Sequence, residues 1–254
     1  MTDAPTPDAP AGSGPATVEV RGGVELSAER RDIELHTSDD LTLVGELALP
    51  VGRPPAATLL TLHPLPTAGG FMDSHIIRKA AARLPAQADL AVLRFNFRGA
   101  SSPRGRSEGE FGDGVSERFD LAAAVDFVRQ QGLPTPWLVG WSFGTEVALK
   151  HGLEHEIAGA ILLSPPLSRT SQAELARWAD SGRTLVALIP EFDDFLRPAE
   201  AREKFAVVPE ARLVEVAGGK HLWVGEHQTR RVLSEIVRVV HPAALPLSET
   251  WPVA

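Results

Sequence analysis

The feature that most constrains this chain is the pentapeptide Gly-Trp-Ser-Phe-Gly at positions 140–144. A short apolar run at 137–139 enters it, and a segment compatible with a helix, 145–149, follows it. A strand that turns at once into a helix leaves no room for side chains across the turn, which explains the two glycines. The same turn strains the backbone of Ser142, exposes its hydroxyl and places it near the positive end of the helix dipole. The pattern therefore predicts a serine presented for chemistry at the end of a strand.

Composition sets the outer limits. A chain of 254 residues with 43% hydrophobic and 23% charged residues is typical of one large globular domain. We predict a tail at 1–16, a single domain at 17–240 and a second tail at 241–254. The net charge of −8 argues against a nucleic-acid partner, and the absence of cysteine excludes disulfides and thiolate metal sites. Because neither an apolar run of about 18 residues nor a signal-peptide pattern occurs, we expect no membrane span and a cytoplasmic location.

Apolar runs alternate with helical segments along most of the chain. Two alternating strands, 32–36 and 41–49, predict a hairpin at one edge of a sheet. From Ala57 onward, near-continuous apolar strands are each followed by a helix, which indicates a mostly parallel sheet of about seven to eight strands covered on both faces. The expected strands are 57–63, 90–96, 137–141, 157–164, 184–190 and 212–216, and the expected helices are 74–84, 116–131, 143–151, 171–180, 198–205 and 226–240. Ligands of such α/β sheets bind at the carboxyl ends of the strands, where the candidate residues lie.

A serine hydroxyl needs a base, and the base needs an acid. Of eight histidines, His221 follows the last strand in a loop that two glycines allow to bend back toward the serine, so it is the candidate base. Three carboxylates after the penultimate strand compete for the role of acid: Glu191, Asp193 and Asp194. One of these three carboxylates is expected to be the acid, and the two that are not are expected to be solvated charges of the loop.

Two further stretches extend the pattern beyond the serine turn. They are 63–72, which begins His-Pro-Leu-Pro, and 93–99, which reads Leu-Arg-Phe-Asn-Phe-Arg-Gly. With the turn at 140–144, they resemble the α/β-hydrolase superfamily, and within it a small subgroup near dienelactone hydrolases and related esterases. The resemblance covers about 45–240 and implies an α/β-hydrolase fold with the order serine, acid, histidine. Its acid motif, here with Pro190 in place of a glycine, favours Asp193 over Asp194.

The resemblance also implies an oxyanion hole of two backbone amides. One belongs to Phe143, after the serine, and the other to the loop after the strand that ends at His63. Because Pro64 and Pro66 have no N–H, Leu65 is the expected second donor. We expect His63 to support this loop rather than to act as the base.

Two departures from the family pattern affect the surroundings of the site. The segment 100–109, with Arg104 and Arg106, is longer and more basic than the usual turn, and we expect a solvated loop there rather than a site for acidic substrates. One short helix between 164 and 184 predicts little or no cap domain. Aromatic residues are the candidate walls of an open substrate site, although core packing is the alternative for each: Phe71, Trp141, Phe143, Phe195 and Trp223.

We therefore predict a serine hydrolase that cleaves an ester or thioester of a small acyl substrate through an acyl-enzyme. A catalytically silent binding protein of the same fold, a peptidase and an acyltransferase remain alternatives. We expect no cofactor and no metal, because no set of ligands with suitable spacing occurs. The acyl group and the oligomeric state are left open.

Overall fold

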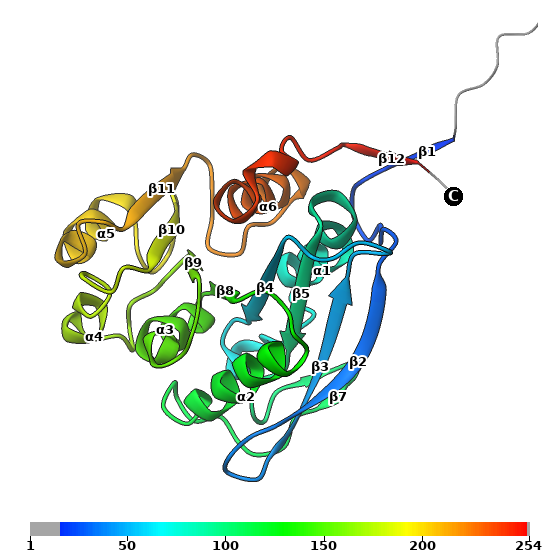
Figure 1. Cartoon of the computed structure of the whole chain (residues 1–254). Helices are drawn as coiled ribbons and strands as arrows, with labels where there is room; N and C mark the ends of the chain where they lie inside the picture. The colour runs from blue at the N-terminus through cyan, green and yellow to red at the C-terminus, as the bar shows by residue number, and fades with distance from the viewer. Residues whose placement is uncertain (1–15, 253–254) are drawn as a thin grey trace, which may run out of the picture.

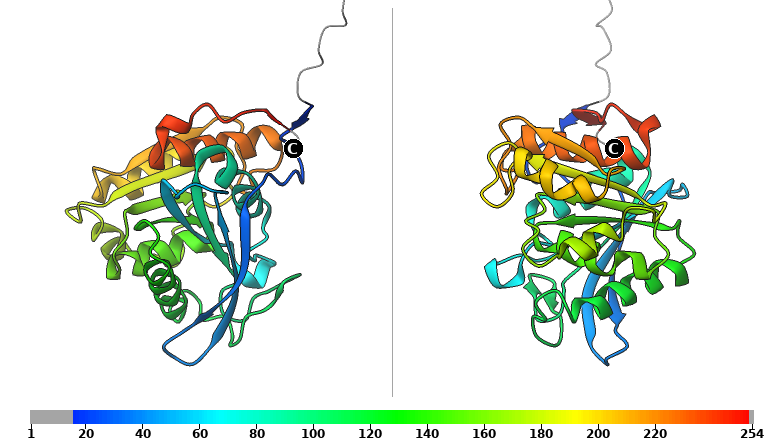
Figure 2. Two further views of the ribbon diagram at one scale, coloured as in Figure 1. Left: turned by 45° about the vertical axis from the view of Figure 1, so that its right-hand side comes forward. Right: turned by 90° about the vertical axis from the view of Figure 1, so that its left-hand side faces the viewer.

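The computed structural model describes residues 16–252 (Figures 1 and 2). Residues 1–15 of the predicted tail at 1–16 lie outside the described residues. So do residues 253–254 of the predicted tail at 241–254. Within the described part of the chain, no helix is both long enough and apolar enough to cross a membrane. The first and last described strands, β1 (Thr17–Glu19) and β12 (Thr250–Pro252), pair with each other in antiparallel fashion beside the main body.

The main sheet of the described chain has eight strands in the order β11-β10-β9-β8-β4-β5-β3-β2. Every pairing among the six strands from β11 to β5 is parallel, whereas β3 pairs with β5 and with β2 in antiparallel fashion. This confirms the predicted mostly parallel sheet with an antiparallel hairpin at its edge. The strands are β2 (Glu29–His36), β3 (Thr42–Leu49), β4 (Ala57–Leu62), β5 (Leu90–Phe95), β8 (Pro136–Trp141), β9 (Gly159–Leu163), β10 (Thr184–Pro190) and β11 (Arg212–Val216).

Helices cover both faces of the sheet, which buries β4 and β5 completely. On one face, α1 and α6 pack on Leu59, Val139 and other alternate side chains of the strands. On the other face, α2 and α3 pack on Leu60, Leu138 and their alternates. The helices are α1 (His75–Ala88), α2 (Glu117–Gln130), α3 (Phe143–His151), α4 (Gln172–Ala176), α5 (Pro198–Lys204) and α6 (Glu226–Val240). Burial on both faces is why the strands are near-continuous apolar runs.

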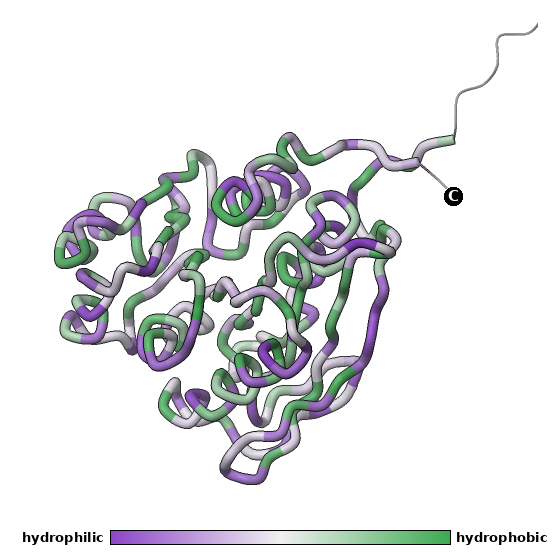
Figure 3. Tube along the Cα trace, in the orientation of Figure 1, coloured by the Kyte–Doolittle hydropathy of each residue, from purple (hydrophilic) through white to green (hydrophobic). Residues whose placement is uncertain are grey.

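The edge strand β2 is mostly polar, and its tube is largely purple in Figure 3. Charges on an edge strand discourage pairing with another chain. The basic segment 100–109 folds into a small hairpin, β6 (Ser101–Ser102) and β7 (Gly105–Arg106), which contacts β3. Arg104 pairs with the buried Glu46, whose side chain is 1% exposed, and with the exposed Asp32. This arginine is exposed, as expected of a solvated loop, and its guanidinium also belongs to an ion-pair network with two carboxylates of the neighbouring strands.

The serine turn lies at the point in the sheet where the order in which successive strands are added reverses. From β4 the chain moves to β5 on one side and then crosses to β8 on the other. At such a switch point the loops after two neighbouring strands separate, which leaves a crevice at their carboxyl ends. Ser142 follows β8 and the His63 loop follows β4, so both lie there. No cap domain covers this edge in the described chain, because the connection from β9 to β10 holds only the five-residue α4.

Candidate active site

Ser142 has backbone angles of φ 51° and ψ −116°, in the region that most side chains avoid. The close packing of the turn holds it there. A Cβ at position 144 would lie 2.0 Å from the carbonyl oxygen of Leu62, and one at 140 would lie 2.6 Å from that of Gly144. Only glycine fits at either position, as predicted from the sequence. The serine is the N-cap of α3, so the helix dipole points its positive end at the hydroxyl.

The structure brings Ser142, His221 and Asp193 together from three different loops. The Nε2 atom of His221 lies 2.9 Å from the Oγ atom of Ser142. Its Nδ1 atom lies 3.1 and 3.0 Å from the two carboxylate oxygens of Asp193. The histidine and the aspartate are buried, whereas the serine is partly exposed. A hydroxyl in contact with one ring nitrogen, and a carboxylate in contact with the other, is the arrangement that allows an imidazole to withdraw the serine proton.

The three competing carboxylates have different surroundings. Asp193 is buried and accepts hydrogen bonds from the amides of Phe195 (2.8 Å) and Leu196 (3.2 Å). Burial raises its pKa, but its hydrogen bonds with His221 and with these amides outweigh that effect, and the pKa of Asp193 is lowered. Glu191 is exposed and accepts from the Gly218 amide at 2.7 Å, and Asp194 is also exposed. Of these three carboxylates, Asp193 is the one that contacts the imidazole in the described chain.

Three side chains hold the histidine loop, and of these the sequence predicts only Trp141 at the site, as a candidate wall. The backbone carbonyl of His221 accepts hydrogen bonds from Trp141 Nε1 and from Ser164 Oγ, both at 3.1 Å. The next carbonyl, that of Leu222, contacts His75 Nε2 at 2.6 Å. These contacts come from the ends of β8 and β9 and from the first turn of α1, so the loop is fixed from three sides. Ser164 directly follows the carboxyl end of a parallel strand. A polar residue at that position is the sequence signal that could have placed it near the site.

The loop after β4 is fixed through His63. The Phe97 amide donates to its Nε2 atom at 2.9 Å, so the proton resides on Nδ1, which donates to the Pro64 carbonyl at 2.6 Å. That carbonyl shares a planar peptide unit with the Leu65 N–H, which points the opposite way. Among residues 16–252, neither the Leu65 amide nor the Phe143 amide donates to a protein acceptor. These are the two amides that the sequence predicts as the oxyanion donors.

We expect protonation of His63 to destabilise the fold. Burial lowers the pKa of His63 to about 4, although its bond to Pro64 opposes the shift. A group whose pKa is lowered on folding contributes stability above its unfolded pKa and loses it as the pH falls toward the folded value. Between pH 7.5 and pH 5, the free energy of unfolding should therefore decrease by about 2 kcal/mol. Urea denaturation of the wild type and of His63→Gln tests this, and equal pH dependence in the two proteins would contradict it.

The predicted aromatic walls fall into two groups. Phe195 packs against the His221 ring, with 4.5 Å between ring centroids, and Phe71 is partly exposed on the loop before α1. Trp141, Trp223 and Phe143 are instead at most 3% exposed and belong to the core. The structure does not place these three on the surface of the site, and the core-packing alternative applies to them.

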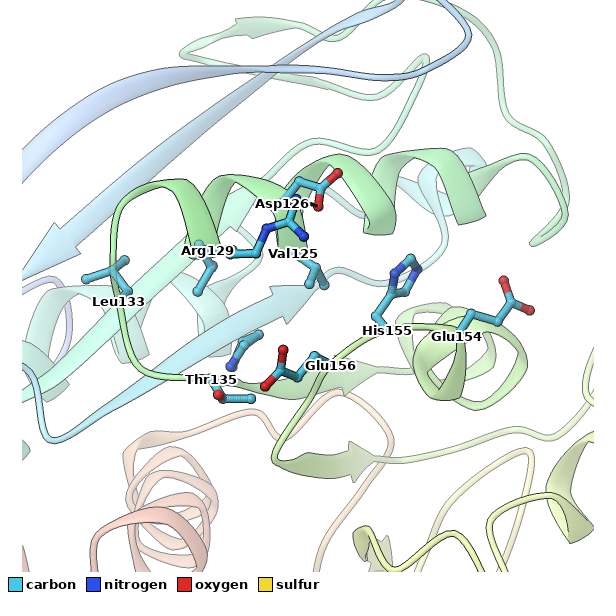
Figure 4. Close-up of a pocket in the computed structure, with 10 residues that line it drawn as sticks. Val125, Asp126, Arg129, Leu133, Thr135, Glu154, His155 and Glu156 are labelled. Atoms are coloured by element: carbon cyan, nitrogen blue, oxygen red, sulfur yellow. Dashed lines mark ion pairs between the residues drawn. The ribbon is translucent and has the colours of Figure 1, made fainter.

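The alternative to the triad as a site would be a cavity elsewhere on the sheet, and the cavity beside α2 and β8 holds no arrangement of serine, histidine and acid. This cavity, of about 390 Å³, lies between the end of α2, the start of β8 and residues 154–156, at the opposite edge from Ser142 (Figure 4). Its charged side chains are mixed in sign, including the pair Asp126–Arg129, and its one hydroxyl is that of Thr135. Within the described chain, no cluster of three histidine or acidic side chains is arranged to bind a metal ion.

Comparisons with known proteins agree with this architecture. No protein-family model matches the chain. An uncharacterized protein of Rickettsia prowazekii is 33% identical over 118 residues, which are 45% of this chain and 48% of that protein, so the match spans about half the length of that relative.

Among solved structures, an alpha-beta serine hydrolase homologue from Coxiella burnetii aligns with a TM-score of 0.71 and 23% identity, covering 83% of this chain and 97% of that one. A serine hydrolase without a lid from Xanthomonas campestris aligns at 0.70 and 23%, covering 88% and 99%. The Pyrococcus furiosus esterase Pf2001 aligns at 0.66 and 21%, covering 84% and 93%. At these identities the likeness establishes architecture alone, and with the sheet order it shows that this chain has the α/β-hydrolase fold.

Proposed function

We propose that the protein is a serine hydrolase that cleaves a carboxylic ester or thioester of a small acyl substrate. The observation that carries the proposal is the continuous contact from Ser142 Oγ through His221 to the buried Asp193. A binding protein does not require a nucleophile, a base and an acid in this geometry. The motifs at 63–66 and 93–99 favour a relationship to dienelactone hydrolases and similar esterases.

In the proposed mechanism, His221 Nε2 takes the proton of Ser142 as Oγ attacks the carbonyl carbon of the substrate. The Leu65 and Phe143 amides stabilise the negative charge that forms on the carbonyl oxygen. His221 then gives its proton to the departing alcohol or thiol, and an acyl-enzyme forms. Water attacks this ester with His221 as base, and the acid and the free serine are released. Asp193 keeps the imidazole oriented and stabilises its charged form.

The known structures support the coarser part of the proposal. Proteins of the same fold, including the Coxiella and Xanthomonas structures, are described as serine hydrolases or homologues of them, and the Pyrococcus protein as an esterase. The Xanthomonas protein is described as having no lid, and the described part of this chain also carries only the short α4 where a cap would insert. An edge of the sheet without a cap is compatible with small, freely diffusing substrates.

Labelling with a fluorophosphonate probe tests the nucleophile directly. We expect the wild type to be labelled once, at Ser142, and to hydrolyse p-nitrophenyl esters and thioesters faster than matched anilides. Absence of both labelling and turnover would favour the binding-protein alternative. Faster cleavage of amides would indicate a peptidase, and product transfer to an added alcohol in preference to water would indicate an acyltransferase.

A further inference from the structure

Exposed apolar side chains are concentrated on the two loops that carry the acid and the base of the candidate triad, and one of them, Phe195, packs against the His221 ring. Seven large apolar residues of the described chain are strongly exposed, and four of them belong to the two loops that carry Asp193 and His221. We call these four the apolar rim: Phe192 (48% exposed), Phe195 (61%), Leu222 (55%) and Val224 (73%). Single exposed apolar residues are ordinary, whereas a cluster beside a reactive group indicates a contact surface.

Hydrogen bonds join the two rim loops into one unit. The Phe192 amide donates to the Gly219 carbonyl at 2.9 Å, and the Gly218 amide donates to Glu191 at 2.7 Å. The Phe195 ring rests against the His221 imidazole. The two loops are therefore joined to each other, and Phe195 is held against the base.

The position of the apolar rim relative to His221 and the oxyanion amides determines which part of the substrate it contacts. In acyl transfer the base returns its proton to the leaving oxygen or sulfur, so the leaving atom must come within hydrogen-bond reach of His221 Nε2. The carbonyl oxygen faces the Leu65 and Phe143 amides, which belong to the β4 loop and to the start of α3. Because Phe195 packs on His221 itself, the group attached to the leaving atom extends over the rim loops.

We propose that the apolar rim is a subsite for an apolar, uncharged alcohol or thiol, the leaving part of the substrate. The exposed charges on the same loops balance, since Glu191 and Asp194 are matched by Arg197 and Lys220, whereas Asp193 is buried against His221. The rim thus offers apolar contact without a net charge to attract an ionic leaving group. This inference rests on the proposed function and specifies which half of the ester is recognised.

Two series of esters separate the halves of the substrate. Acetates of methanol through hexanol share one acyl-enzyme, so deacylation is identical and differences in kcat/KM report contacts of the alcohol alone. Methyl esters of acetate through hexanoate vary only the acyl part. Full burial of a methylene changes a rate about fourfold, so contact on one side predicts roughly a twofold rise in kcat/KM per methylene of the alcohol.

Substitutions in the apolar rim then test whether its residues cause the preference for longer alcohols. In Leu222→Ser combined with Val224→Ser, we expect the ratio of kcat/KM for hexyl over methyl acetate to fall roughly fivefold, because one-sided apolar contact is lost. The methyl-ester series should be unchanged. Val51→Ser, which alters another exposed valine (57%) in the turn between β3 and β4, is the matched control and should leave both series unchanged.

A flat alcohol series, or loss of selectivity in the methyl-ester series instead, would overturn the assignment of the rim to the leaving group. If the probe still labels Ser142 in either case, the proposed function stands and only this inference fails. Absence of labelling and of hydrolysis in the wild type would overturn both.

Discussion

Replacing Ser142 with alanine is expected to lower kcat by roughly a millionfold, which leaves only the catalysis provided by binding and by the oxyanion amides. The variant removes the one atom that contacts His221 Nε2. Alanine faces the same backbone strain at φ 51° as serine, so the fold should be retained. Hydrolysis of p-nitrophenyl acetate under pre-steady-state conditions measures the loss, and thermal unfolding of the same samples checks the fold.

The control for this variant is Ser27→Ala, because Ser27 is exposed and lies far along the chain from every triad loop. It should retain full activity and labelling. Turnover by Ser142→Ala within a few-fold of the wild type, with labelling retained, would show that another residue is the nucleophile.

Asp193→Asn is expected to lower kcat by roughly ten-thousandfold, because the amide places a donor where the imidazole needs an acceptor and so favours the wrong tautomer. Asp194→Asn is the matched control: the same substitution, one residue along, on an exposed side chain. It should change kcat by less than about threefold, since no triad contact depends on it. Steady-state kinetics of both variants on one ester give the comparison.

The reverse ranking would assign the acid to Asp194. A purely structural role for Asp193 predicts a different result. Its carboxylate also accepts the Phe195 and Leu196 amides, so loss of these bonds alone would lower the unfolding temperature and leave kcat per folded molecule near normal. Active-site titration with the fluorophosphonate probe, combined with thermal unfolding, separates these two outcomes.

The regular elements were predictable because their signals are local. Strands buried on both faces must be apolar throughout, so β4, β5 and β10 were found within one or two residues of their observed ends. The predicted helix at 171–180 is the main difference, since α4 ends at Ala176. Trp178 instead turns into the core, where its Nε1 atom donates to the Leu149 carbonyl at 3.0 Å. A contact with a residue 29 positions away overrides the local preference for helix.

The sequence by itself determined the serine turn, because the steric demand of Gly140 and Gly144 acts within five residues. It also determined the chain order of serine, acid and histidine, and the single N–H among the residues at 64–66. The sequence motif favoured Asp193 as the acid, and the tertiary structure places its carboxylate in contact with His221. Only the tertiary structure decided that Trp141 supports the histidine loop rather than lining the site, and that Arg104 pairs with Glu46. Those outcomes depend on the directions in which side chains from distant strands point, and packing sets those directions only once the sheet has assembled.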